Sequence, residues 1–191
     1  PILPHINKIS YNDFVVLELS SFQLMTCKIN PKVSVITNIS ENHLDWHKNF
    51  DEYIEAKANI FKNQEKNNLF VSNFDCKILN KISAKNTGKK RFFSVESKIN
   101  DGCYLDKNGY INFCENRKKV RIINKNKIKI LGMHNIENFM AAILSCYDFV
   151  SLENIKFVAN NFKGLSHRIE FIAEINGTRY YNDSIATSPN R

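Results

Sequence analysis

The stretch that decides the fold of this chain is FVVLELSSFQL, residues 14–24. It begins with an apolar run long enough for one strand buried on both faces, so a strand of a parallel sheet is predicted over residues 14–19. Glu18 closes this run, and its carboxylate needs a partner because an unpaired buried charge is costly. Ligands of open parallel sheets bind at the carboxyl ends of strands, which predicts that Glu18 holds a cation there. An ion pair with a nearby Lys or Arg is the alternative.

A second apolar run, VSVIT at residues 33–37, predicts the neighbouring strand of the same sheet. The loop after it should lie at the same edge as Glu18 and is crowded with the polar residues Asn38, Ser40, Glu41, Asn42, His43, Asp45 and His47. Glu18 and His43 could share a divalent ion, and oxygen-dominated ligands favour Mg²⁺ or Mn²⁺. His43 and His47 could instead hold zinc, although the pair lacks the glutamate of the HExxH motif.

The next segment predicts a helix over residues 49–61. Asn49 is a suitable N-cap, and Glu52 follows three residues later. The predicted apolar stripe consists of Phe50, Tyr53, Ile54, Ala58 and Phe61. Lys57 lies on this inward stripe, so it must extend to solvent, meet a carboxylate, lose its proton or be modified.

The middle of the chain predicts strands at residues 69–72 and 90–94, with a weak helix over 75–81 between them. Short alternating segments between residues 102 and 130, the last of them at 128–130, predict small antiparallel strands. We interpret this region as a β appendage on an α/β body.

The longest helix is predicted over residues 132–147, with a buried stripe formed by Ile136, Phe139, Met140, Ile143 and Tyr147. Asn135 and Asn138 lie three residues apart in its first turns. Paired amides can recognise the donor and acceptor edge of a purine, whereas helix capping and surface solvation are the alternative.

A second helix is predicted over residues 152–161, ended by Gly164 as its C-cap, and a domain boundary follows near residues 164–166. Arg168 then leads into two predicted strands, 169–175 and 178–182. The Asn176-Gly177 pair between them is the strongest short signal for a β-hairpin.

The composition indicates a globular protein with a basic surface. Of 191 residues 43% are hydrophobic, and the formal net charge is +8. The aromatic residues do not interleave with the basic runs as a nucleic-acid stacking platform requires, whereas an anionic small substrate fits the charge. The five cysteines form no CxxC motif, and with no signal-peptide pattern at the start we expect reduced thiols in a cytoplasmic protein.

Several blocks together resemble the Mur ligase family. They are LELSSFQL (17–24), ITNISENHLD (36–45), AKANIF (56–61), GMHN (132–135) with Asn138, GLSHRIE (164–170) and YNDS (181–184). The resemblance covers nearly the whole chain and is weakest between residues 76 and 129. Phe22, Gln23 and Leu24 favour the branch that adds D-glutamate to UDP-N-acetylmuramoyl-L-alanine. Another ligase of the superfamily, including one that extends folate, or a catalytically inactive ATP-binding module are the alternatives.

The resemblance implies an α/β fold in which residues 1–164 are the ATP-binding central domain, a parallel-sheet P-loop-type ATPase domain. Residues 165–191 would begin a Rossmann-like C-terminal domain. No P-loop motif, GxxxxGK[ST], is present in the sequence. We therefore expect the P-loop part and the uridine-nucleotide domain to precede Pro1 and most of the C-terminal domain to follow Arg191. Such a piece alone should be inactive, and the protein is expected to be a monomer.

The implied activity is ATP-dependent amide-bond formation through an acyl phosphate, with two Mg²⁺ ions. By resemblance, Glu18 would bind one ion, His43 the other, and Lys57 would be carbamylated; these three form the predicted catalytic and metal-binding set. Further implied contacts are made to adenine by Asn135 and Asn138, to the ATP phosphates and ribose by Arg168 and Asp183, and to the muramoyl substrate by Ser20 and Thr187. Ile185 stands where the family usually has a lysine, so a cation expected near the substrate is missing.

Overall fold

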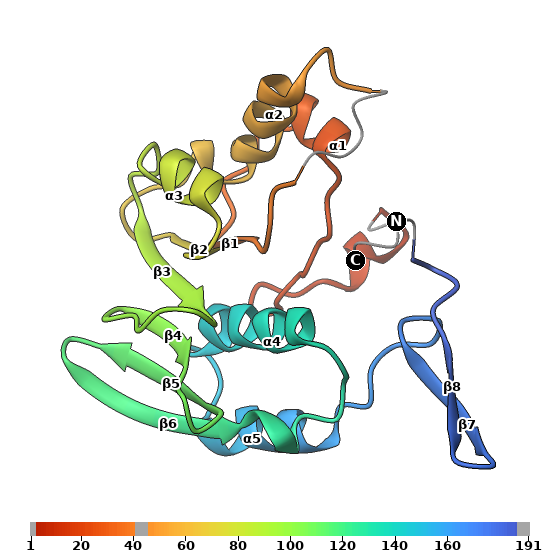
Figure 1. Ribbon diagram of the computed structural model, residues 1–191. Helices are drawn as coiled ribbons and strands as arrows, with labels where there is room; N and C mark the ends of the chain where they lie inside the picture. The colour runs from red at the N-terminus through yellow and green to blue at the C-terminus, as the bar shows by residue number, and fades with distance from the viewer. Residues whose placement is uncertain (1–2, 41–45, 187–191) are drawn as a thin grey trace.

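The computed structural model describes residues 3–40 and 46–186 of the chain (Figure 1). Its main feature is a six-stranded sheet in which spatial order follows chain order. The strands are β1 (Val33–Ile36), β2 (Leu69–Asn73), β3 (Lys89–Ser94), β4 (Gly102–Leu105), β5 (Tyr110–Glu115) and β6 (Lys118–Asn124). The first four pair in parallel, and β4, β5 and β6 pair antiparallel. The α/β class is therefore confirmed, as a mixed sheet.

Helices cover both faces of this sheet (Figure 1). One face carries α2 (Phe50–Lys62) and α3 (Lys77–Ser83), and the other carries α4 (Met133–Cys146) and α5 (Leu152–Asn161). The alternation of β2 produces this arrangement: Leu69 and Val71 belong to the core shared with α4, whereas Phe70 faces α2 and α3. Both faces of β2 are buried, as its continuous apolar run predicted.

The strand predicted over residues 14–19 is wrong. This segment has no regular secondary structure, and Phe14, Val16 and Leu17 are 67%, 93% and 54% exposed. A strand is stable only when a neighbour pairs with its backbone, and within the described residues β1 pairs with β2 alone. The apolar run therefore lies outside the sheet, where Phe14 contacts the ring of Phe149 with centroids 5.0 Å apart.

The predicted β appendage is also wrong, because its strands continue the main sheet. Gly102 begins β4, which pairs in parallel with β3 opposite Phe92. Gly102 has a φ of 139°, and a Cβ there would lie 1.9 Å from the Phe92 carbonyl oxygen, so only glycine fits this junction. The strand predicted at 128–130 does not form; the 3₁₀ turn Lys125–Lys127 precedes it, and Ile128 packs into the core.

The locally encoded elements agree with prediction. Asn49 caps α2 by accepting a hydrogen bond from the backbone N–H of Glu52, at 2.9 Å. The hairpin forms as a separate two-stranded sheet of β7 (Glu170–Ile175) and β8 (Thr178–Asn182). Its turn residues Asn176 and Gly177 both have positive φ, 51° and 77°. The predicted Gly164 C-cap is wrong, because α5 ends at Asn161 with Phe162 as its cap.

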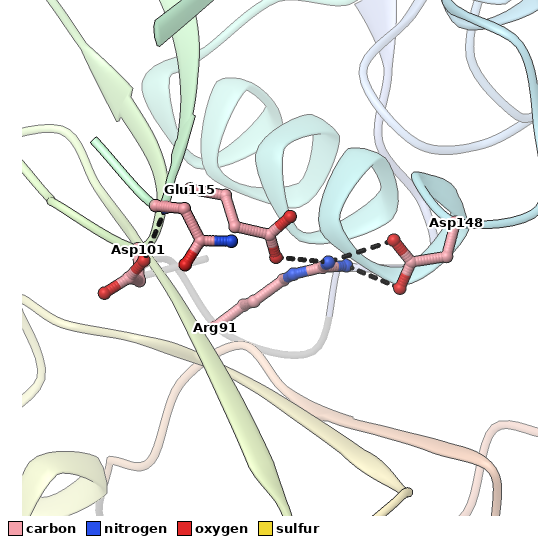
Figure 2. Close-up of polar contacts among 5 residues, drawn as sticks. Arg91, Asp101, Glu115 and Asp148 are labelled. Carbon is pink, nitrogen blue, oxygen red and sulfur yellow. Dashed lines mark hydrogen bonds and ion pairs between the residues drawn. The ribbon is translucent and has the colours of Figure 1, made fainter. Parts of the chain in front are cut away.

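A charge cluster joins the sheet to the end of α4 (Figure 2). Arg91 on β3 points between two carboxylates, donating to Asp148 at 2.9 and 2.9 Å and to Glu115 at 2.7 Å. Burial alone would lower the pKa of Arg91, but the two carboxylates outweigh it, so this pKa is raised and the guanidinium stays charged. No helix among the described residues is long and apolar enough to cross a membrane.

Candidate functional site

The serine pair of the LSSFQ stretch begins the short helix α1 (Ser21–Thr26), which lies beside α2 (Figure 1). Ser20 is the N-cap, and it forms a capping box with Gln23. The Ser20 backbone N–H donates to Gln23 Oε1 at 2.9 Å, and Ser20 Oγ accepts from the Gln23 backbone N–H at 3.4 Å. The motif therefore has a local structural use, which turns the chain at the position where Glu18 is presented.

Ser21 contacts a histidine that the sequence analysis considered only as a zinc ligand. Ser21 Oγ lies 2.8 Å from His47 Nε2, and the two residues are 2% and 3% exposed. The His47 ring also packs edge-on against Tyr53, with centroids 5.3 Å apart. No local pattern pairs residues 26 positions apart, so the sequence carried no signal for this contact.

Lys57 lies on the inner side of α2, as predicted. It is half-buried, and its Nζ lies 5.2 Å from the centre of the Tyr53 ring. A cation at this distance from an aromatic face is attracted by the ring. Lys57 therefore does not extend freely to solvent, and the question of its chemical state is a real one.

The predicted metal-binding set is only partly within view. Glu18 is exposed and makes no hydrogen bond or ion pair with another described residue. His43 lies outside the described residues, as does Thr187. Residues 3–40 and 46–186 contain no group of three or more His, Cys, Asp or Glu side chains that could hold a metal. An exposed carboxylate without a protein partner suits a hard cation such as Mg²⁺, but the joint site of Glu18, His43 and Lys57 stays a prediction.

A second predicted group does come together. A cavity of about 330 Å³ lies between the start of α4 and the β7–β8 hairpin, and both Asn135 and Arg168 line it. Its other cationic lining residues are Lys129, Lys163 and Arg179, while Glu174 supplies one carboxylate. Glu174 accepts from Arg179 Nε at 2.9 Å, so this charge is already paired. The remaining cations make the cavity suitable for an anionic ligand.

The two predicted adenine contacts differ in their placement. Asn135 Nδ2 donates to the Leu131 carbonyl at 2.6 Å, which fixes the amide near the start of α4. Asn138 is exposed, does not line the cavity, and donates weakly to Asn135 Oδ1 at 3.4 Å. The alternative considered above, a structural use of the amides, is thus realised for Asn135, whose Oδ1 still faces a neighbouring donor.

Arg168 is held by the residues on either side of it. The Ile169 backbone N–H donates to Asp183 Oδ1 at 3.2 Å, and His167 Nδ1 lies 2.8 Å from Asn182 Nδ2. Ile169 has a φ of 46°, which is costly for a β-branched residue and requires such fixing. Asp183 therefore orients the turn that presents Arg168, a role that the sequence analysis did not identify.

Comparison with known proteins gives a consistent result. The family model described as "Mur ligase middle domain" matches residues 6–146. Proteins named UDP-N-acetylmuramoylalanine–D-glutamate ligase from Clostridium kluyveri and Clostridium acetobutylicum are 47% and 48% identical over 191 and 192 residues. Each match includes 100% of this chain, which spans about 41% of the length of these relatives.

Solved structures support the fold. MurF from Acinetobacter baumannii gives a TM-score of 0.63 at 21% identity, with 84% of this chain and 35% of that chain covered. MurF from Thermotoga maritima, solved in complex with ADP, gives 0.62 at 18% identity over 90% of this chain and 40% of the other. The cavity and the α1–α2 corner are thus features of a recurrent architecture.

Proposed function

Since this chain belongs to the Mur ligase family, we propose that the protein carrying it uses ATP to join D-glutamate to UDP-N-acetylmuramoyl-L-alanine. One observation carries the proposal. The whole of this chain aligns, at 47% identity, with relatives that bear that activity in their names. Because it spans about 41% of their length, we further propose that residues 3–186 need the remaining parts of such a protein for turnover.

The chemistry proposed is activation followed by amide formation. A carboxylate is a poor acyl donor until one of its oxygens becomes a good leaving group. Transfer of the γ-phosphoryl group of ATP to the muramoyl carboxylate gives an acyl phosphate and ADP. The amine of D-glutamate then attacks the acyl carbon, forming the amide and releasing phosphate and a proton. Catalysis of such a transfer depends on positioning and on stabilising the phosphoryl charge.

The cavity beside α4 supports a nucleotide-binding role within this proposal. Arg168, Lys129 and Lys163 give it a positive lining, which suits the phosphates of ATP. Asn135 and Asn138 would contact the adenine edge. Asp183 would act through the turn that presents Arg168, and any contact it makes with the ribose would be additional.

The proposed metal site uses residues at the other end of the sheet. Glu18, His43 and Lys57 would hold two Mg²⁺ ions, which when bound would neutralise charge on the transferred phosphoryl group. A protonated lysine cannot take part. The neutral Lys57 amine would therefore add CO₂ and release a proton, which turns it into a carbamate with oxygen ligands. Ser20 and Thr187 would contact the muramoyl substrate, which for Ser20 is additional to its capping role.

The test is a phosphate-release assay with the full-length protein. ATP, Mg²⁺ and UDP-N-acetylmuramoyl-L-alanine would be supplied with D-glutamate, L-glutamate, L-lysine or meso-diaminopimelate in separate reactions. Phosphate release and a new amide product are expected with D-glutamate only. Product with another amino acid, and none with D-glutamate, would contradict the assignment. Residues 1–191 alone, assayed in parallel, should release no phosphate.

A further inference from the structure

We propose that His47 is a positioning residue of the ligase site, which ties the segment carrying Glu18 to the helix carrying Lys57. The inference rests on the proposed function and deepens it. It assigns a task to a buried side chain that touches no predicted substrate or metal contact. Two contacts and one nearby charge support it.

The first contact joins His47 to the start of α1. His47 Nε2 and Ser21 Oγ are 2.8 Å apart, and the His47 side chain is 0% exposed. Ser21 comes directly after the N-cap and three residues after Glu18. Holding the Ser21 hydroxyl therefore fixes the start of α1 and the direction in which the chain leaves Glu18.

The second contact joins His47 to α2. Its ring meets the Tyr53 ring edge-on, at 5.3 Å and an interplanar angle of 70°. Tyr53 is 5% exposed, and Lys57, one turn further along the same helix face, has its Nζ 5.2 Å from the Tyr53 ring centre. His47 thus sets the orientation of the aromatic surface beside which Lys57 lies.

Glu52 favours one tautomer of His47. His47 Nδ1 is buried, has no hydrogen-bond partner among the described residues, and lies 3.8 Å from Glu52 Oε2. The carboxylate favours the proton on Nδ1, which leaves Nε2 to accept from the Ser21 hydroxyl. Glu52 Oε2 is itself fixed, because it accepts from the Lys48 backbone N–H at 2.7 Å.

Packing alone does not explain a buried histidine here. An apolar ring would fill the same space without the cost of desolvating an imidazole and a hydroxyl. A polar pair, unlike an apolar contact, permits one relative orientation of the two helices. A site assembled from residues 18 and 57 needs such an orientation, since a displacement of about 1 Å can cost roughly 100-fold in rate.

The experiment compares His47→Phe, His47→Gln and Ser21→Ala in the full-length protein. In His47→Phe, kcat should fall roughly 100-fold, while KM for ATP changes by no more than about threefold. The glutamine in His47→Gln keeps a group that can bond Ser21, so it should restore most of the lost kcat. The double variant His47→Phe/Ser21→Ala should be no slower than His47→Phe, because the two residues act as one unit.

Ser34→Ala is the matched control. Ser34 is also 2% exposed and donates to a buried partner, Gln64 Oε1, at 2.9 Å, but it lies on β1. It should lower the melting temperature about as much as Ser21→Ala and leave kcat unchanged. Amide hydrogen exchange provides a readout independent of activity: residues 20–24 and 50–54 should exchange faster in His47→Phe and Ser21→Ala, but not in Ser34→Ala.

Two results would overturn the inference. One is wild-type kcat in Ser21→Ala and His47→Phe; the other is equal loss of kcat in Ser21→Ala and Ser34→Ala, which would indicate a stability effect only. If the wild-type protein itself makes no product, the proposed function fails, and the exchange comparison alone decides the coupling. Unchanged exchange in both segments would then refute it.

Discussion

Arg91 donates two hydrogen bonds of 2.9 Å to the carboxylate of Asp148, which lies 57 positions further along the chain and just beyond α4. The pair fixes the end of α4 against β3, and Glu115 extends it to β5 (Figure 2). The Arg91 side chain is 11% exposed and also lies 5.4 Å from the centre of the Phe113 ring.

Replacing this arginine should destabilise the protein. We expect Arg91→Met to lower the free energy of unfolding by about 2 kcal/mol, the value for losing charge-assisted hydrogen bonds to half-exposed carboxylates. Arg91→Lys should recover less than half of it, because an ammonium cannot bond Asp148 through two nitrogens. Urea unfolding measures both. The exposed pair of Lys85 and Glu55 is the control, and a loss in Lys85→Met equal to that in Arg91→Met would contradict the argument.

The junction between β3 and β4 should tolerate no side chain at Gly102. Gly102→Ala would place a Cβ against the backbone of Phe92, so a loss of roughly 3 kcal/mol or more is expected in denaturant unfolding. Gly177→Ala is a matched control, since Gly177 also has positive φ but has nothing within 4 Å of the added carbon. It should cost only about 1 kcal/mol. Equal losses in the two variants would show that backbone strain alone matters.

Glu137 on α4 gives a pH-dependent prediction. Burial raises the pKa of its carboxyl above the ordinary value, although Asn73 Nδ2 donates to it at 3.2 Å and acts in the opposite direction. A raised folded-state pKa means that its contribution to stability is present in acid and is lost as the pH rises through that pKa. Glu137→Gln should therefore raise the melting temperature at pH 7, and this gain should vanish below the ordinary glutamate pKa. A gain that persists in acid would indicate a cause other than ionisation.

The cationic cavity predicts a role for Arg168 in nucleotide binding. Arg168→Met should weaken binding of ATP by about tenfold or more, through loss of a charge-assisted contact to phosphate. Calorimetric titration of the full-length protein with ATP measures this. Arg117, an exposed arginine on the β5–β6 turn, is the control, and Arg117→Met should bind ATP normally. Unchanged affinity in Arg168→Met would remove the cavity from the proposed site.

The proposed carbamate on Lys57 can be detected directly. With ¹³C-bicarbonate, the wild-type protein should give a carbamate carbon signal in NMR that is absent from Lys57→Arg. Lys57→Arg should also lower kcat by about 100-fold or more, because a guanidinium cannot form the oxygen ligand. A signal that survives in Lys57→Arg would assign the carbamate to another amine.

Local signals in the sequence were sufficient for the elements whose partners lie close by. Asn49 and Glu52 predicted the start of α2, and Asn176-Gly177 predicted the hairpin, because capping and turn geometry depend on a few adjacent residues. The cavity was foreseen only as two separate groups, Asn135 and Arg168, which the structure then brings together.

The failures concern pairing over distance. The apolar content of residues 14–19 correctly indicated a segment suited to burial, but a strand also needs a neighbour, and periodicity does not say whether one is present. The attachment of β4 to β3 was missed for the same reason: the alternation after Gly102 is equally compatible with a separate sheet. The bond between Ser21 and His47 depends on how α1 meets α2, which no local pattern specifies.

The strand order β1 to β6 has a consequence for how the molecule forms. Each strand after the first docks on one synthesised immediately before it, so no gap in the sheet waits for a later segment. The chain therefore avoids the long loop closures that slow the assembly of interleaved parallel sheets. During synthesis on the ribosome, each emerging strand would meet a finished edge, and only the newest edge would stand open to other chains.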